Sequence, residues 1–345
     1  MRTYTTNLCR AGLFLALSLV GCETATSPAA EADPQPPIAS AEEAQVDMPA
    51  FEAGTPGPVS LRRLTSLQLD GSFRALFGDE LAVASLNEPD LVLGGLASVG
   101  AGTSTFSPRA VETLEKLTTS ILAQVLDSDV MRPRLMVCEP TSAEDLTCLR
   151  KIITRLGERA WRRTLSADEV DAIAGRVQHA ATTLDDLEEG LTLGLSTVLQ
   201  SPFFLYRVEL GEDDPNGDGR RFTSVELASR LSFFLWNAPP DDALLDAAKA
   251  DELLSDEGLR AQAERLLADP RAREGFSNFV HEYLHLSRLA KSTKDHLQFD
   301  RYYETFNADA RTEVLKLYDY LVFDADADIR RALTSKVTHL NPSLA

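Results

Sequence analysis

The stretch NFVHEYLHLSRLA, residues 278–290, contains His281, Glu282 and His285 in the spacing His-Glu-x-x-His. On an α-helix this spacing places both histidines on one face, where they can bind zinc beside a glutamate that acts as the general base of a hydrolase. In one class of these enzymes the third zinc ligand stands six residues after the second histidine, where this chain has Lys291. A zinc-dependent hydrolase is therefore an alternative hypothesis and not the favoured one.

The helix expected to carry this motif runs over residues 271–289. At 100° per residue, one of its faces gathers apolar side chains: Phe276, Phe279, Val280, Tyr283 and Leu284. His281 and His285 fall on the opposite, polar face. The favoured interpretation is a helix that packs through its apolar face and exposes both histidines to solvent.

A second group of oxygen-bearing side chains begins like a calcium-binding loop: Asp214, Asn216 and Asp218. Such a loop takes oxygen ligands from alternate positions and ends with a carboxylate at its twelfth position. Here the twelfth position is Val225, and Glu226 stands one residue later, where it forms a capping box with Thr223. The sequence therefore favours a polar connection, and calcium is the alternative.

Two of the four cysteines, Cys138 and Cys148, are separated only by EPTSAEDLT. In an exported protein, two such thiols are expected to form a disulfide that closes a small loop. Metal ligation is the alternative, and it would need two further soft ligands. The chain has no Cys-x-x-Cys-His motif, which excludes covalent c-type haem.

The first residues indicate where the chain is sent. Residues 1–21 combine a positive start with a short apolar run, which is typical of a signal peptide. The run ends in Leu19-Val20-Gly21-Cys22, a bacterial lipobox, so we expect lipid on Cys22 and a membrane anchor in the cell envelope. A plain secretory signal with a chance cysteine is the alternative. Residues 22–60, rich in Ala, Pro, Glu, Ser and Thr, are predicted to form a disordered tether.

Composition and periodicity set the fold class. The chain has 345 residues and a net charge of −19, which disfavours nucleic acid as a partner. From residue 61 onward the apolar spacing is helical, with Ser166 and Glu169 in another capping box and one apolar helix face expected from Leu184 to Val198. Further helices are predicted over residues 240–249, 257–268 and 307–322. The only strand candidate is SPFFLYRVEL, residues 201–210. We predict an all-α fold of multi-helix modules packed in series after the tether.

Four stretches carry a family resemblance: RRLTSLQLDGSFRALFG (62–78), RLGERAWRRTLSADEV (155–170), EEGLTLGLSTVLQSPFFLYRVELG (188–211) and FTSVELASRLSFFLWNAPPDDALL (222–245). They resemble three tandem planctomycete-type secreted-protein families of unknown function, numbered 1587, 1595 and 1592. The resemblance implies modules at 61–137, 138–212 and 218–345, the first of them degraded. Relatives normally continue into two more domains, so the chain is expected to be part of a longer protein.

The resemblance also bears on function. Where this chain has Glu282-Tyr283-Leu284, the family pattern reads Gln-Trp-Leu, which implies a packing helix. The expected function is a lipid-anchored interaction or scaffold module of the cell envelope, with envelope proteins as partners and no resident cofactor. Members of these families often share a chain or a gene neighbourhood with c-type cytochrome modules. This association implies a further alternative, a partner of envelope c-type cytochromes.

Overall fold

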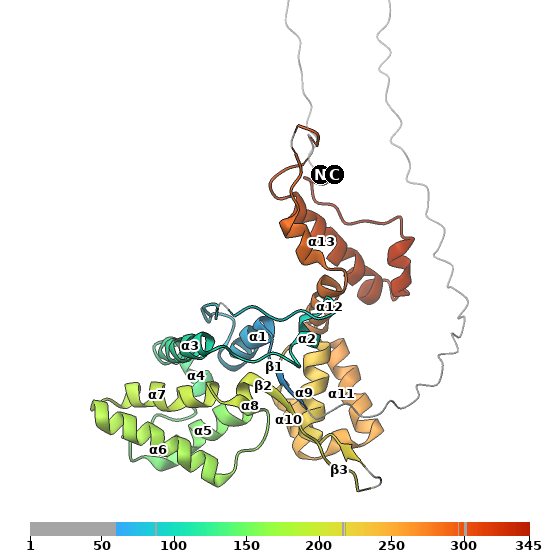
Figure 1. Ribbon diagram of the computed structural model, residues 1–345. Coiled ribbons are helices and arrows are strands. Elements are labelled where there is room, and N and C mark those ends of the chain that lie inside the picture. The colour runs from blue at the N-terminus through green and yellow to red at the C-terminus, as the bar shows by residue number, and fades with distance from the viewer. Residues whose placement is uncertain (1–59, 87, 216, 218, 296, 300–301) are drawn as a thin grey trace, which may run out of the picture. The chain divides into compact units, whose positions relative to one another are not determined.

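The computed structural model describes residues 60–345 except 87, 216, 218, 296, 300 and 301 (Figure 1). The predicted signal peptide, Cys22 and nearly all of the predicted tether lie outside these residues. Ser60, the last residue of the predicted tether, is the first residue of a strand. All described residues belong to one compact unit.

Helices dominate the first part of the described chain, as predicted. They are α1 (Ser66–Phe77), α2 (Ala97–Gly100), α3 (Pro108–Leu126), α4 (Arg132–Leu135), α5 (Leu146–Trp161), α6 (Ala167–Leu184), α7 (Leu187–Leu199) and α8 (Pro202–Leu205). The Ser166 capping box opens α6, since its hydroxyl accepts from the Glu169 N–H and the Glu169 carboxylate accepts from the Ser166 N–H.

The second part is helical as well. It contains α9 (Ser224–Leu235), α10 (Asp242–Lys249), α11 (Asp256–Ala268), α12 (Arg271–Tyr283) and α13 (Phe306–Asp319), with short turns η1 (Glu252–Leu254), η2 (Leu286–Lys291), η3 (Tyr320–Asp324) and η4 (Ile329–Leu333). Across the described residues, no helix has the length and apolar character needed to cross a membrane.

Two short antiparallel ribbons complete the fold. β1 (Ser60–Arg63) pairs with β2 (Tyr206–Glu209), and β3 (Glu212–Asp213) pairs with β4 (Arg220–Arg221). The predicted strand in 201–210 is thus present as β2, preceded by the α8 turn. The other strands were not predicted, because two to four residues give too short an alternation to read.

The larger hydrophobic core draws on α1, α3, α5, α6 and α7. Two glycines let α7 approach α6 closely: a Cβ on Gly190 or Gly194 would lie within 2.7 Å of backbone atoms of Ala181 or Val177. A smaller cluster joins α9, α10, η1, α11 and α12.

The predicted disulfide is confirmed between Cys138 and Cys148, whose Cα atoms are 5.9 Å apart. Cys148 is buried in the larger core, and Cys138 packs against it. The loop that the bond closes leads into α5, whose first turn is capped by Asp145 accepting from the Cys148 N–H.

Candidate functional site

The structure ends α12 earlier than the sequence predicted. The helix stops at Tyr283 rather than at residue 289, and His285 adopts a left-handed backbone conformation with φ of 54°. His281 therefore lies on α12, whereas His285 lies beyond its end. The two histidines do not share one face of a continuous helix, which the zinc motif requires.

The Glu282 carboxylate is engaged with the segment around α2. Its Oε2 accepts from the Ala97 N–H at 3.0 Å, and its Oε1 accepts from the Asn278 amide at 3.5 Å. Leu96, the N-cap residue of α2, provides no side-chain cap, so Glu282 supplies an acceptor that this short helix lacks. The arrangement makes Glu282 a contact residue between distant segments.

His285 packs against the same segment. A Cβ on Gly95 would lie 1.9 Å from the imidazole Cε1, so only glycine leaves room for the ring there. Burial, followed by the charge of Arg311, lowers the pKa of His281 below its usual range. In the part of the chain that the structure describes, no three or more His, Cys, Asp or Glu side chains are grouped to hold a metal ion.

The calcium-like stretch lies between β3 and β4. The Asp214 N–H donates to the Gly219 carbonyl across the hairpin, while Asn216 and Asp218 lie outside the described residues. The predicted role of Glu226 as a helix cap is confirmed: its carboxylate accepts from the Thr223, Leu210 and Gly211 N–H groups. Calcium binding at this hairpin stays a prediction.

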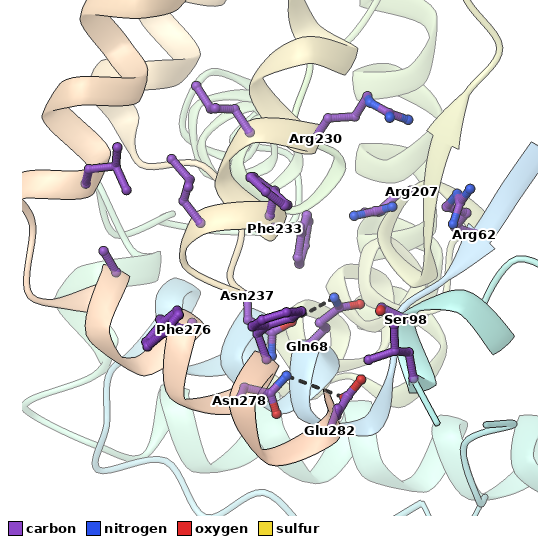
Figure 2. Close-up of a pocket in the computed structure, with 18 of the residues that line it drawn as sticks. Arg62, Gln68, Ser98, Arg207, Arg230, Phe233, Asn237, Phe276, Asn278 and Glu282 are labelled. Atoms are coloured by element: carbon purple, nitrogen blue, oxygen red, sulfur yellow. Dashed lines mark hydrogen bonds between the residues drawn. The ribbon is translucent and has the colours of Figure 1, made fainter. Parts of the chain in front are cut away.

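A cavity of about 820 Å³ is bordered by α9, α11, α12 and η3 (Figure 2). We call it the aromatic groove and define it by six apolar side chains: Leu231, Phe233, Phe234, Phe276, Phe279 and Phe323. Figure 2 shows Phe233 on α9 and Phe276 on α12 among the side chains that line it.

The groove corrects the prediction that α12 packs its whole apolar face into a core. Of that face only Val280 is buried, at 1% exposed, whereas Phe279 is 45% and Tyr283 is 62% exposed. Phe276 and Phe279 line the groove instead. Periodicity identified the apolar face correctly, but it could not show that this face borders an open hollow.

Aromatic contacts hold the groove wall in place. The Phe276 ring meets Phe323 edge-on at 5.6 Å between centroids, and Phe279 stacks on Tyr283 at 5.4 Å. Gly275 lies under this wall, where a Cβ would come within 2.1 Å of the Leu235 carbonyl oxygen. The glycine thus lets α12 reach the end of α9 and closes one side of the groove.

Polar side chains interrupt the apolar wall at one edge. The Gln68 amide donates to the Asn237 Oδ1 at 2.8 Å, and Asn278 lies nearby with its amide on Glu282 (Figure 2). Within the described residues, the Asn237 amide nitrogen and the Asn278 amide oxygen have no hydrogen-bond partner. These two groups remain available to whatever enters the groove.

Three arginines gather at another side of the groove: Arg62, Arg207 and Arg230 (Figure 2). All three face one carboxylate, that of the buried Glu209. The Arg230 guanidinium lies 2.7 Å from it, that of Arg207 3.1 Å and that of Arg62 3.5 Å. Sequence reasoning missed this arginine cluster, because only the β1–β2 pairing brings Arg62 to Arg207.

Two known families match the chain. Residues 222–345 match PSD4, a protein of unknown function (DUF1592), and residues 148–209 match PSD5, a protein of unknown function (DUF1595). The predicted resemblances to families 1592 and 1595 are thereby confirmed. The resemblance of residues 62–78 to family 1587 was not found and stays a prediction. Comparisons with curated proteins and with solved structures gave no match.

The groove crosses the boundary of these matches. All six side chains that define it belong to the DUF1592 segment, residues 222–345. Arg207 belongs to the DUF1595 segment, residues 148–209, and Arg62 and Gln68 precede both. The site is therefore assembled from three stretches of the chain.

Proposed function

We propose that this chain is an interaction module of the cell envelope, held at the membrane by lipid on Cys22, and that the aromatic groove binds an apolar segment of a partner protein. The observation that carries the binding role is the groove itself. Phe234 is 80% exposed and Phe279 is 45% exposed, although both border a hollow that could bury them. Soluble proteins rarely leave a contiguous apolar patch open unless it binds something.

The size and chemistry of the groove fit a short protein segment. Its volume lies within the range of about 300–1,000 Å³ typical of small-ligand sites. The free amide groups of Asn237 and Asn278 suit a peptide backbone, which carries both donors and acceptors. A plain hydrocarbon chain would leave both groups without partners and would cost their desolvation.

The neutral dye N-phenyl-1-naphthylamine, which fluoresces in apolar surroundings, tests the groove. We expect one dye molecule to bind per chain. Phe276→Ala removes a wall residue and should weaken binding about tenfold, as expected for the loss of roughly 1.4 kcal/mol of apolar contact. Leu333→Ala, at a residue that is 85% exposed and outside the groove, is the control and should leave binding unchanged. If both variants changed dye affinity equally, the dye would not be bound in the aromatic groove and the proposed binding role would be wrong.

The anchor has its own test. Acylation needs the Cys22 thiol, so Cys22→Ser should shift the protein from the membrane fraction to the soluble or unprocessed fraction. The measurement is membrane fractionation together with fatty-acid labelling of the wild type. Unchanged partition, with no label on the wild type, would refute the lipid anchor and leave the groove untouched.

A further inference from the structure

The arginine cluster places like charges side by side. Arg62 and Arg207 are directly opposite each other in the β1–β2 ladder, so their side chains leave the ribbon on the same face. Like charges in this relation destabilise a ribbon. Arg230, from α9, adds a third guanidinium on the same side of the groove. The chain thus accepts a repulsive arrangement at the edge of an apolar cavity.

Glu209 does not balance the cluster. It is the single carboxylate that pairs with these arginines in the part of the chain that the structure describes, so three positive charges face one negative charge. Within the described residues, the buried Arg62 Nε and Glu209 Oε1 make no hydrogen bond, although the Arg62 Nε lies 3.5 Å from Glu209 Oε2 and the Arg207 guanidinium lies 3.1 Å from Glu209 Oε1. The cluster therefore holds unmatched positive charge.

A buried arginine beside the cluster adds to its positive electrostatic potential. Arg162 is fully buried next to Arg207, and its guanidinium donates to the carbonyls of Phe203, Phe204 and Tyr206 rather than to a carboxylate. Burial, with the charge of Arg207, lowers the pKa of Arg162, and burial also lowers the pKa of Arg207. Guanidinium groups nevertheless stay charged at neutral pH, so the field persists.

We propose that the arginine cluster is an anion subsite of the groove and binds a carboxylate of the apolar segment that occupies it. This inference rests on the groove binding described above and adds the chemistry of one end of the occupant. A carboxylate matches the planar fork of a guanidinium and would balance a further charge of the cluster. The partner segment therefore has an apolar body with an acidic side chain or a free C-terminus at the arginine end.

Two dyes separate apolar binding from charge recognition. N-phenyl-1-naphthylamine and its sulfonated analogue 8-anilinonaphthalene-1-sulfonate share an apolar body and differ in one anionic group. The sulfonate should bind the wild type about tenfold more tightly, because a hydrogen bond to a charged group contributes roughly 1.5–3 kcal/mol and 1.4 kcal/mol is tenfold.

Arg230→Gln should abolish this preference, measured as the ratio of the sulfonate affinity to the neutral-dye affinity of the same variant. Arg230 suits the test because 43% of its side chain is exposed and Glu209 keeps two other arginines after its loss. Arg134→Gln is the matched control: Arg134 lines a separate hollow with Arg155 and Arg159, away from the groove. It should leave both affinities unchanged.

The outcomes separate the two proposals. If the neutral dye does not bind, groove binding itself is wrong. If it binds and the sulfonate has no advantage, or if Arg134→Gln removes the advantage as fully as Arg230→Gln, the anion subsite is wrong and the arginines serve the fold alone.

Peptides then identify the source of the carboxylate. The capped tetrapeptide acetyl-Leu-Phe-Leu-Glu-amide should displace the neutral dye several-fold better than its glutamine counterpart. Displacement by oleate, with none by either peptide, would contradict a protein segment as the occupant.

Discussion

Helices α7 and α12 have the same length, 13 residues, but use their apolar side chains differently. In α7, from the DUF1595 segment, Leu191, Leu195 and Val198 are each at most 2% exposed. In α12, from the DUF1592 segment, Val280 is buried while Phe276 and Phe279 border an open groove. The first helix secures the fold and the second presents a surface.

The difference follows from the neighbours of each helix. Two glycines let α7 lie directly against α6, so its apolar side chains are covered along the helix. The single glycine of α12, Gly275, brings only its first half against α9. Phe276 and Phe279 line the hollow instead of a core, and Tyr283 stacks on Phe279 near the end of the helix. Apolar periodicity alone therefore does not distinguish a core helix from a binding helix.

The largest expected effect is in the core helix. Leu195 is fully buried, so Leu195→Ala should lower the free energy of unfolding by about 2–5 kcal/mol, the range for emptying a core position. Urea denaturation followed by circular dichroism measures this change. A loss below about 1 kcal/mol would show that α7 is not packed as described.

Removal of the disulfide should have the next largest effect. The double variant Cys138→Ala/Cys148→Ala frees a loop of about ten residues, and the gain in unfolded-state entropy should cost about 2–3 kcal/mol. Reductant should lower the stability of the wild type by a similar amount and leave the double variant unchanged. Equal sensitivity of both proteins to reductant would contradict the bond.

A smaller effect concerns the stability of the fold at acidic pH. A hydrogen bond from Arg163, helped by the Ser166 N–H, lowers the pKa of Glu169 to about 2 from its ordinary 4.5. The folded-state pKa is depressed, so the stabilisation is complete above pH 4.5 and is lost as pH falls toward 2. Glu169→Gln keeps a capping group but no charge, and should flatten the fall in melting temperature over this range. An unaltered acid profile would mean that this ion pair does not stabilise α6.

Local signals in the sequence predicted much of the fold. The capping boxes correctly marked the starts of α6 and α9, the apolar spacing placed α10, α11 and α13 within about three residues of their ends, and the short spacing of the two cysteines predicted the disulfide. One prediction failed locally: the apolar face expected from Leu184 to Val198 is split, because Asp185 turns left-handed and Leu184 ends α6.

The candidate site was much less predictable, because it depends on contacts between distant residues. The early end of α12 accompanies the docking of His285 on Gly95, and Glu282 reaches Ala97 across 185 positions of the chain. The arginine cluster depends on the pairing of β1 with β2. In the sequence, most of the helices of the larger hydrophobic core lie between these two strands. None of these contacts leaves a periodic pattern or motif in the sequence.

The most direct test compares one residue from each helix in two measurements. The free energy of unfolding and the affinity for N-phenyl-1-naphthylamine are measured for Phe279→Ala on α12 and for Leu195→Ala on α7. We expect Phe279→Ala to weaken dye binding about tenfold and to cost less than about 1 kcal/mol of stability, because the ring is already half exposed. A stability loss of about 2–5 kcal/mol with unchanged dye affinity would make Phe279 a core residue and contradict the groove as a binding surface.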